Sequence, residues 1–362
     1  MSPKQHVMQI DDSSYEGPLL QVNNLKTYFS TSHGIVRAVD GVSFTLERGR
    51  SLGLVGESGS GKTVLSRSIM GLLPPHNVVR EGTVHFAGVE LSSAPLDKLR
   101  DLWGVQISMV FQDPMTALNP VVRVGRQITE SLRYHLAMDR ADAQATAVAL
   151  LKSVGLPEPE ERLRWYPHQF SGGMCQRIVI AVALACGPKL VLADEPTTGL
   201  DVTVSAQILD LLSRLQQERF MSMIMVTHDL GVVSGRCDDT AVVYAGKIVE
   251  MGPTAVLFRD MKMPYTEALL RSTPRLSNAS HTRLPTIPGN PPNPAHYPGG
   301  CRFAPRCEYA QPRCRAEEPP LKQASPGHVY ACWYPVGTPE GRDAHERNEK
   351  VGLAPATTGG SF

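Results

Sequence analysis

The residues most suited to chemistry form a glycine-rich loop that contains a lysine. Residues 56–63 fit the pattern G-x-x-x-x-G-K-[S/T], in which backbone N–H groups surround nucleotide phosphates. An apolar run at residues 52–55 predicts a buried strand, and residues 64–70 have helical spacing, so the loop has the flanks it requires. The sequence therefore predicts a nucleoside triphosphate site built from Gly56, Glu57, Ser58, Gly59, Ser60, Gly61, Lys62 and Thr63. Lys62 is expected to reach the β and γ phosphates, and the Thr63 hydroxyl to ligate Mg²⁺.

Candidate catalytic side chains follow two later apolar runs. Residues 189–193 precede Asp194 and Glu195, and residues 221–226 precede the segment that contains His228. Strands of an open α/β sheet collect ligands at their carboxyl ends. We expect Asp194 to hold Mg²⁺, Glu195 to orient or deprotonate water, and His228 to contact the γ-phosphate. An acidic pair at a strand end is common by itself, and the phosphate loop is what favours the catalytic interpretation.

Three weaker signals accompany these residues. Gln112 follows the apolar run 105–111 and is expected at the same sheet edge. Ser171 and Gly173 precede an apolar helix, where the serine could cap the helix and the glycines could offer N–H groups to an anion. Phe29 ends an alternating run and is our candidate for stacking on the base, with Tyr28 as the alternative, although a strand aromatic can equally belong to the core.

The elements around these residues indicate an α/β fold. Residues 19–29 and 36–46 alternate as half-buried antiparallel strands do, before the phosphate loop. Residues 122–136 and 141–154 have helical spacing and predict a helical insertion inside the α/β core.

Composition limits the classes of function. The chain has 362 residues, 42% hydrophobic and 20% charged, and its net charge of +1 gives no general reason to expect nucleic acid as a partner. Apolar runs stop well short of a bilayer span, and the polar start lacks a secretory signal, so the cytoplasm is the expected location. Seven cysteines are then expected to be reduced or metal-bound, with Cys175, Cys186 and Cys237 as small buried hydrophobes.

Taken in order, these motifs resemble the ATPase subunits of ABC transporters. The matching segments are residues 56–63, Gln112, residues 170–173, the Asp194-Glu195 pair, residues 199–201 and His228. The resemblance covers about residues 18–255, after a flexible leader at 1–17. It implies a P-loop NTPase with a RecA-like core, an antiparallel β subdomain and a helical subdomain at about 113–177. It also implies a head-to-tail dimer in which Ser171 and Gly173 act on ATP held by the opposite subunit and Asp201 lies on the dimer seam.

One departure narrows the resemblance. The family's usual Leu-Ser-Gly-Gly-Gln ends in Met174 here, a form similar to the first ATPase of dipeptide and oligopeptide importers. Such a chain would pair with a different second ATPase and two membrane permeases, serve an extracytoplasmic peptide-binding protein, and lie peripherally on the cytoplasmic face of the inner membrane. Nickel and glutathione are alternative substrates. A soluble ABC ATPase of translation or DNA repair is disfavoured by the lack of tandem domains, and a non-hydrolysing regulatory subunit by intact Lys62, Glu195 and His228.

Residues 256–336 form an extension of different character. The part from 284 to 300 is rich in proline and glycine and predicts a strap with little core. Cys301, Cys307, Cys314 and Cys332 follow without C-x-x-C pairs, which suits a 4Fe-4S cluster at least as well as zinc. The importer family ends in a similar Cys-x-Phe-x-x-Arg-Cys segment, and some members hold such a cluster, so a cluster is our expectation. The alternatives are a zinc ion held by three of the cysteines or with His328, and thiols without any ligand. Residues 337–362 are polar and predict a mobile tail.

Overall fold

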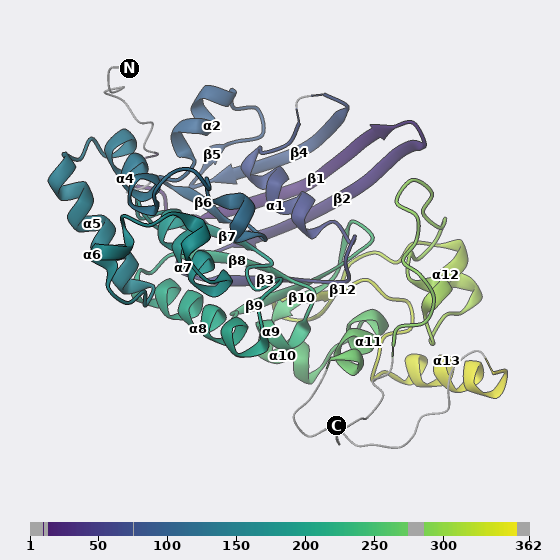
Figure 1. Ribbon diagram of the computed structural model, residues 1–362. Helices are drawn as coiled ribbons and strands as arrows, with labels where there is room; N and C mark the ends of the chain where they lie inside the picture. Colours follow the sequence, from purple (N-terminus) through teal and green to yellow (C-terminus); the bar gives the residue numbers. More distant parts are fainter. Residues whose placement is uncertain (1–9, 11–13, 75, 274–285, 353–362) are drawn as a thin grey trace.

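Two sheets and their helices make up the described part of the chain. The computed structural model describes residue 10 and residues 14–74, 76–273 and 286–352. A small antiparallel sheet lies above a larger mixed sheet, with a helical insertion at one end of the larger sheet (Figure 1). The C-terminal segment, by which we mean the described residues from 261 onward, lies at the other end. The predicted α/β class, with an antiparallel subdomain and a helical insertion, is confirmed.

The small sheet forms as the alternating pattern predicts. Its strand order is β2-β1-β4-β5, with β1 at Leu20–Thr31, β2 at Gly34–Leu46, β4 at Val78–Phe86 and β5 at Val89–Glu90. Val22, Leu25 and Val84 are buried on its inner face, where they pack with residues of the larger sheet. Burial of one face in this way explains the alternation.

The larger sheet has the order β11-β12-β10-β9-β3-β8-β7-β6. Strands β6, β7, β8, β3 and β9 run parallel, and β10, β12 and β11 continue the sheet in antiparallel fashion. Val110, Asp194, Thr227 and Val55 therefore end their strands at one edge. The bounds are β3 Ser51–Val55, β6 Ile107–Val110, β7 Leu190–Asp194, β8 Ser222–Thr227, β9 Asp239–Tyr244, β10 Lys247–Pro253, β11 Lys322–Ser325 and β12 His328–Tyr330.

Helices cover the sheet and build the insertion. No helix of the described residues is both long and apolar enough to cross a bilayer. The helices of the first 260 residues are α1 Lys62–Met70, α2 Leu96–Leu102, α3 Pro114–Ala117, α4 Val124–His135, α5 Arg140–Ser153, α6 Pro159–Arg162, η1 Pro167–Gln169, α7 Gly172–Ala183, α8 Val202–Glu218, α9 Leu230–Val233 and α10 Thr254–Arg259.

Residues 286–300 form an irregular strap with little buried surface, as the sequence predicts, but the residues on either side of it pack into a core together with β9. Tyr244 of β9 packs against Tyr265 and Phe303, with ring centroids 4.5 and 5.2 Å away. Proline and glycine keep residues 286–303 out of helices and strands, but the aromatic side chains that flank this stretch are buried. The elements here are α11 Pro264–Ser272, η2 Ala304–Arg306, α12 Pro312–Ala316 and α13 Pro339–Lys350.

The two ends of the chain also bear on the predictions. The expectation of a mobile tail is wrong for the described part, since α13 is a helix capped by Thr338, begun by Pro339 and buried at Ala344 and His345. Residues 353–362 lie outside the described residues, as does most of the predicted leader, of which Ile10 is buried in the core.

Candidate nucleotide site

The glycine-rich loop joins β3 to α1 and is wound tightly against β2 and β9. A Cβ on Gly56 would lie 2.1 Å from the carbonyl oxygen of Val243, and one on Gly61 would lie 2.1 Å from that of Ala38. Gly61 also has φ +103°, which L side chains rarely adopt. These two positions therefore require glycine for a backbone reason, independent of any ligand.

Lys62 is buried inside the loop, at 4% exposure. Its Nζ donates hydrogen bonds to the carbonyl oxygens of Gly56 at 2.8 Å and Glu57 at 3.0 Å. Burial lowers the pKa of Lys62, and the nearby carboxylates of Glu195 and Asp194 oppose that shift. The amine thus lies at the centre of the loop, where a phosphate cradle needs a positive charge.

The side chains of Thr63 and Asp194 contact each other at the start of α1. Thr63 Oγ1 donates to Asp194 Oδ1 at 2.9 Å, and Asp194 is 1% exposed at the end of β7. Burial raises the pKa of Asp194, and the bond from Thr63 opposes this. A hydroxyl and a carboxylate are donors that Mg²⁺ prefers, so these residues fit the ion expected from the sequence.

Glu195 is the meeting point of three strand ends. Its Oε2 accepts hydrogen bonds from Gln112 Nε2 at 3.2 Å and Thr198 Oγ1 at 3.1 Å, and its Oε1 lies 3.6 Å from His228 Nδ1. Its φ of +44° is unusual for glutamate and is the kind of strained backbone found at functional sites. Sequence reasoning missed Thr198, whose only signal is its place in the turn that follows the two acids.

Ser171, Gly173 and Asp201 form a separate group at the N-termini of α7 and α8. Ser171 Oγ accepts from the Met174 N–H at 3.4 Å, and Asp201 Oδ1 accepts from the Val204 N–H at 2.9 Å. A Cβ on Gly173 would lie 2.6 Å from Val204, so the two helix starts are packed together. Ser171 and Asp201 are exposed, as a surface that meets another subunit would need.

The two candidates for stacking on the base lie next to each other on β1. The Tyr28 hydroxyl donates to Asp40 Oδ1 at 2.5 Å, and burial together with this bond raises the pKa of Tyr28 to about 12. Phe29 is half-buried opposite Val36 and Val78. Successive strand residues face opposite sides, so only one of the two rings can face a given ligand. Phe29 stays the candidate, since its ring carries no hydrogen-bonding group that needs a partner.

A cavity of about 680 Å³ adjoins the loop. Glu57, Ser58, Glu195 and His228 line this cavity. The C-terminal segment, which the sequence did not connect with the nucleotide site, also contributes to the lining, through Leu269, Ser272, Thr273, Thr286 and Ile287.

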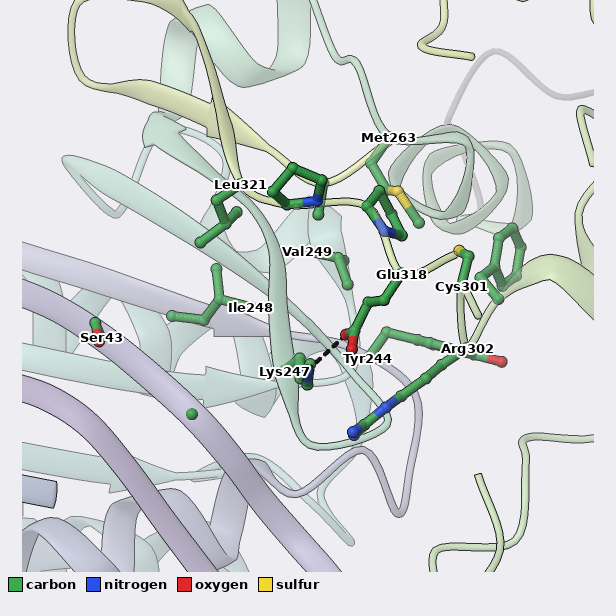
Figure 2. A pocket seen from close by; sticks show the side chains of 15 residues that line it. Ser43, Tyr244, Lys247, Ile248, Val249, Met263, Cys301, Arg302, Glu318 and Leu321 are labelled. Carbon is green, nitrogen blue, oxygen red and sulfur yellow. Dashed lines mark hydrogen bonds and ion pairs between the residues drawn. The ribbon is translucent and has the colours of Figure 1, made fainter. Parts of the chain in front are cut away.

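A second cavity, of about 340 Å³, lies where β2 and β10 meet the C-terminal segment (Figure 2). Figure 2 shows Lys247 and Glu318 pointing toward each other across it, in an ion pair of 2.5 Å. Arg302 at its rim pairs with Asp40 of β2 and donates to the carbonyl of Ala245. Since both cations on its wall are already paired, this cavity belongs to the attachment of the C-terminal segment.

The four C-terminal cysteines gather in one region without forming a metal site. Cys307 is close enough to Cys332, Cys301 and Cys314 for their charges to interact, and burial raises the pKa of Cys301 to about 11 and that of Cys332 to about 12. Among the described residues, no three His, Cys, Asp or Glu side chains are grouped so as to hold a metal ion. The expected 4Fe-4S cluster and the zinc alternative are therefore not supported. His328 instead bonds Glu250, at 2.9 Å.

Comparisons with known proteins agree with this arrangement. Residues 39–198 match the family model described as ABC transporter, and residues 249–314 match that of the oligopeptide/dipeptide transporter, C-terminal region. The chain is 47% identical over 334 residues to the oligopeptide transport ATP-binding protein OppD of Salmonella typhimurium, covering 91% of this chain and 99% of the relative. It is 44% identical over 318 residues to the dipeptide transport ATP-binding protein DppD of Escherichia coli, covering 88% and 97%.

Among solved structures, the chain is similar to a dimeric post-hydrolysis state of the ATP-binding cassette MJ0796 bound to ADP and Pi. The TM-score is 0.58 at 27% identity, over 65% of this chain and 98% of that chain.

Proposed function

Because this chain belongs to the family of oligopeptide and dipeptide transport ATP-binding proteins, we propose that it is the ATP-hydrolysing subunit of a membrane importer of dipeptides or longer peptides. One observation carries the proposal: a single chain joins an ABC nucleotide site to the C-terminal region typical of peptide transporters. Relatives named for oligopeptide and dipeptide transport match this chain over nearly their whole length.

The residues around the loop have distinct roles in this proposal. The loop N–H groups and Lys62 bind the phosphates of ATP, and Phe29 stacks on the base. Thr63, Asp194 and Gln112 would hold Mg²⁺, which neutralises charge on the β and γ phosphates. Glu195 orients or deprotonates the attacking water, while His228, whose Nδ1 lies 3.6 Å from Glu195 Oε1, contacts the γ-phosphate.

The exposed group at α7 and α8 serves a partner in this proposal. Ser171 and Gly173 act on ATP held by a second, different ATPase subunit in a head-to-tail pair, and Asp201 lies on the seam. The similar cassette of known structure is dimeric, which supports such a pairing. Closure of the pair would drive two permeases, from a peripheral position on the cytoplasmic face of the inner membrane, and a peptide-binding protein outside would supply the cargo.

Peptides are favoured over nickel or glutathione as the cargo because the relatives are named for oligopeptide and dipeptide transport. The same full-length similarity disfavours a soluble ATPase of translation or DNA repair. The proposal includes neither an iron-sulfur cluster nor zinc, since the donors of the described residues are not grouped for one.

Reconstitution tests the function. The chain, its partner ATPase and two permeases are placed in liposomes with ATP and the peptide-binding protein, and uptake of a labelled tripeptide is followed. We expect uptake that requires ATP and is abolished in Glu195→Gln. Uptake of nickel or glutathione but not of peptide would replace the proposed substrate, and ATP hydrolysis by the complete assembly without uptake of any of the three would overturn the transport role.

A further inference from the structure

Glu57, the second residue of the phosphate loop, is held by all three of its polar groups. Its carboxylate accepts two hydrogen bonds from Arg306, Nη1 to Oε2 at 2.7 Å and Nη2 to Oε1 at 2.9 Å. Its N–H donates to the Tyr265 hydroxyl at 2.8 Å, and its carbonyl accepts from Lys62 Nζ at 3.0 Å. The loop conformation at this residue is therefore fixed on every side.

Two of these three partners come from the C-terminal segment, which lies outside the part of the chain that matches the ABC transporter model. Arg306 ends the short helix η2, which begins directly after the buried Phe303. The Arg306 side chain is only 4% exposed. Its Nε donates a hydrogen bond to the carbonyl oxygen of Pro288 at 2.8 Å. This second contact fixes the orientation of the guanidinium that binds Glu57. A planar, two-pronged bond of this kind is the geometry in which arginine cannot be replaced by lysine.

We propose that Arg306 is a positioning residue for ATP: through the paired bond to Glu57, the C-terminal segment holds the phosphate loop in its nucleotide-binding form. The geometry connects directly to Lys62, because the Glu57 carbonyl is one of the two carbonyl oxygens that accept hydrogen bonds from the lysine amine. The cavity beside the loop points the same way, since Glu57 and Ser58 share it with Leu269 and Thr273 of the C-terminal segment. Part of the nucleotide site is thus built by residues far beyond the ATPase motifs.

The expected effect follows from pre-organisation. When the loop is already ordered, ATP binding does not include the free-energy cost of ordering it. Without Arg306, part of that cost accompanies ATP binding and lowers the affinity. Arg306→Gln is therefore expected to raise the Kd and the KM for ATP about tenfold, with kcat at saturating ATP changed less than about twofold. Arg306→Lys, which keeps the charge but loses the fork, is expected to lie in between.

The matched control is Arg302→Gln. Arg302 lies four residues earlier, is also largely buried, and also joins the C-terminal segment to the ATPase part through an ion pair, with Asp40. It does not contact the phosphate loop. Both variants remove an ion pair between the C-terminal segment and the ATPase part of the chain, but only Arg306→Gln is expected to weaken ATP binding.

The experiment measures nucleotide affinity of the full chain by titration with a fluorescent ATP analogue, and the KM and kcat of the assembled transporter. Glu57→Gln and the double variant Glu57→Gln/Arg306→Gln complete a cycle. We expect the double variant to bind about as weakly as either single one, because each removes the same bond.

Three results would overturn the proposal: affinity of Arg306→Gln within twofold of the parent chain, an equal loss in Arg302→Gln, or losses that multiply in the double variant. If Arg306→Gln does not fold, Arg306→Lys carries the same comparison. The inference rests on the proposed ATP-hydrolysing role, yet the two fail separately: absent peptide uptake counts against the function, whereas the affinity titration decides the role of Arg306.

Discussion

His328 Nε2 lies 2.9 Å from Glu250 Oε1, and both side chains are completely buried. The same carboxylate accepts the backbone N–H groups of Lys262 and Met263. Glu250 belongs to β10 of the larger sheet and His328 begins the neighbouring strand β12, so this pair joins the ATPase core to the C-terminal segment. A residue that the sequence offered as a metal ligand is in fact a partner for a buried acid.

Loss of this partner is expected to destabilise the chain. His328→Ala leaves Glu250 buried without one of its hydrogen bonds, and removal of one member of a buried pair costs about 3–5 kcal/mol. Urea unfolding of the full chain measures the change. The exposed His296→Ala serves as the control and is expected to change little. A loss below about 1 kcal/mol in His328→Ala would show that the pair does not stabilise the fold.

Glu195→Gln is expected to stop hydrolysis without stopping binding. The amide keeps the size of the side chain and can still bond Gln112 or Thr198, but it cannot accept a proton from water. Phosphate release by the assembled complex should fall by about 10²–10⁴-fold, with ATP affinity within a few fold of the parent. Glu218→Gln, on an exposed ion pair with Arg214, is the matched control and should hydrolyse ATP normally. Turnover above a tenth of the parent rate would remove Glu195 from the catalytic role.

The Ser171→Ala variant distinguishes an effect on ATP held by this chain from an effect on ATP held by its partner. Ser171 is expected to contact ATP held by the other subunit, so the variant should bind ATP normally when alone. In the assembled complex, hydrolysis should fall about tenfold or more, because a donor to the γ-phosphate is lost. Weaker ATP binding by the isolated variant would place Ser171 in the site of its own chain.

The buried thiols predict a falling stability at high pH. Burial raises the pKa of Cys332 from its ordinary value of 9.0 to about 12. Its contribution is complete below pH 9 and is lost between pH 9 and 12, because the unfolded chain releases the proton first. By pH 10 this one thiol lowers the free energy of unfolding by about 1 kcal/mol.

The difference between the parent chain and Cys332→Ala, in urea with a reductant at pH 7 and pH 10, isolates this thiol from the other groups that ionise. A thiolate held by metal would give the opposite slope, since metal binding releases protons and strengthens as pH rises. Iron and zinc content of the same preparations provides an independent check.

The core of the nucleotide site could be predicted because its residues follow strand ends. Asp194, His228 and Gln112 each end or follow a buried apolar run, and parallel pairing places such ends at one edge. The roles given to these residues stay predictions, as do those of Ser171, Gly173 and Asp201, which concern a second subunit.

The C-terminal segment could not be predicted in the same way, because its contacts are long-range. Nothing local marks Arg306 as the partner of Glu57, which lies 249 residues earlier, or His328 as the partner of Glu250. Proline and glycine between residues 286 and 300 indicate irregular backbone correctly, but they do not reveal that Tyr265 and Phe303 on either side meet on Tyr244. The helix starts were the readable signal in this segment, because α11, α12 and α13 each begin with proline, at Pro264, Pro312 and Pro339.

The pairing of β10 with β12 bears on how the protein can be dissected. A truncation near residue 255, where the ATPase motifs end, would remove β12 and leave β10 as an unprotected border strand with a free row of N–H and C=O groups. Such a border invites pairing between copies. The shorter protein would be prone to precipitate during expression, although every motif residue proposed to contact ATP would still be present.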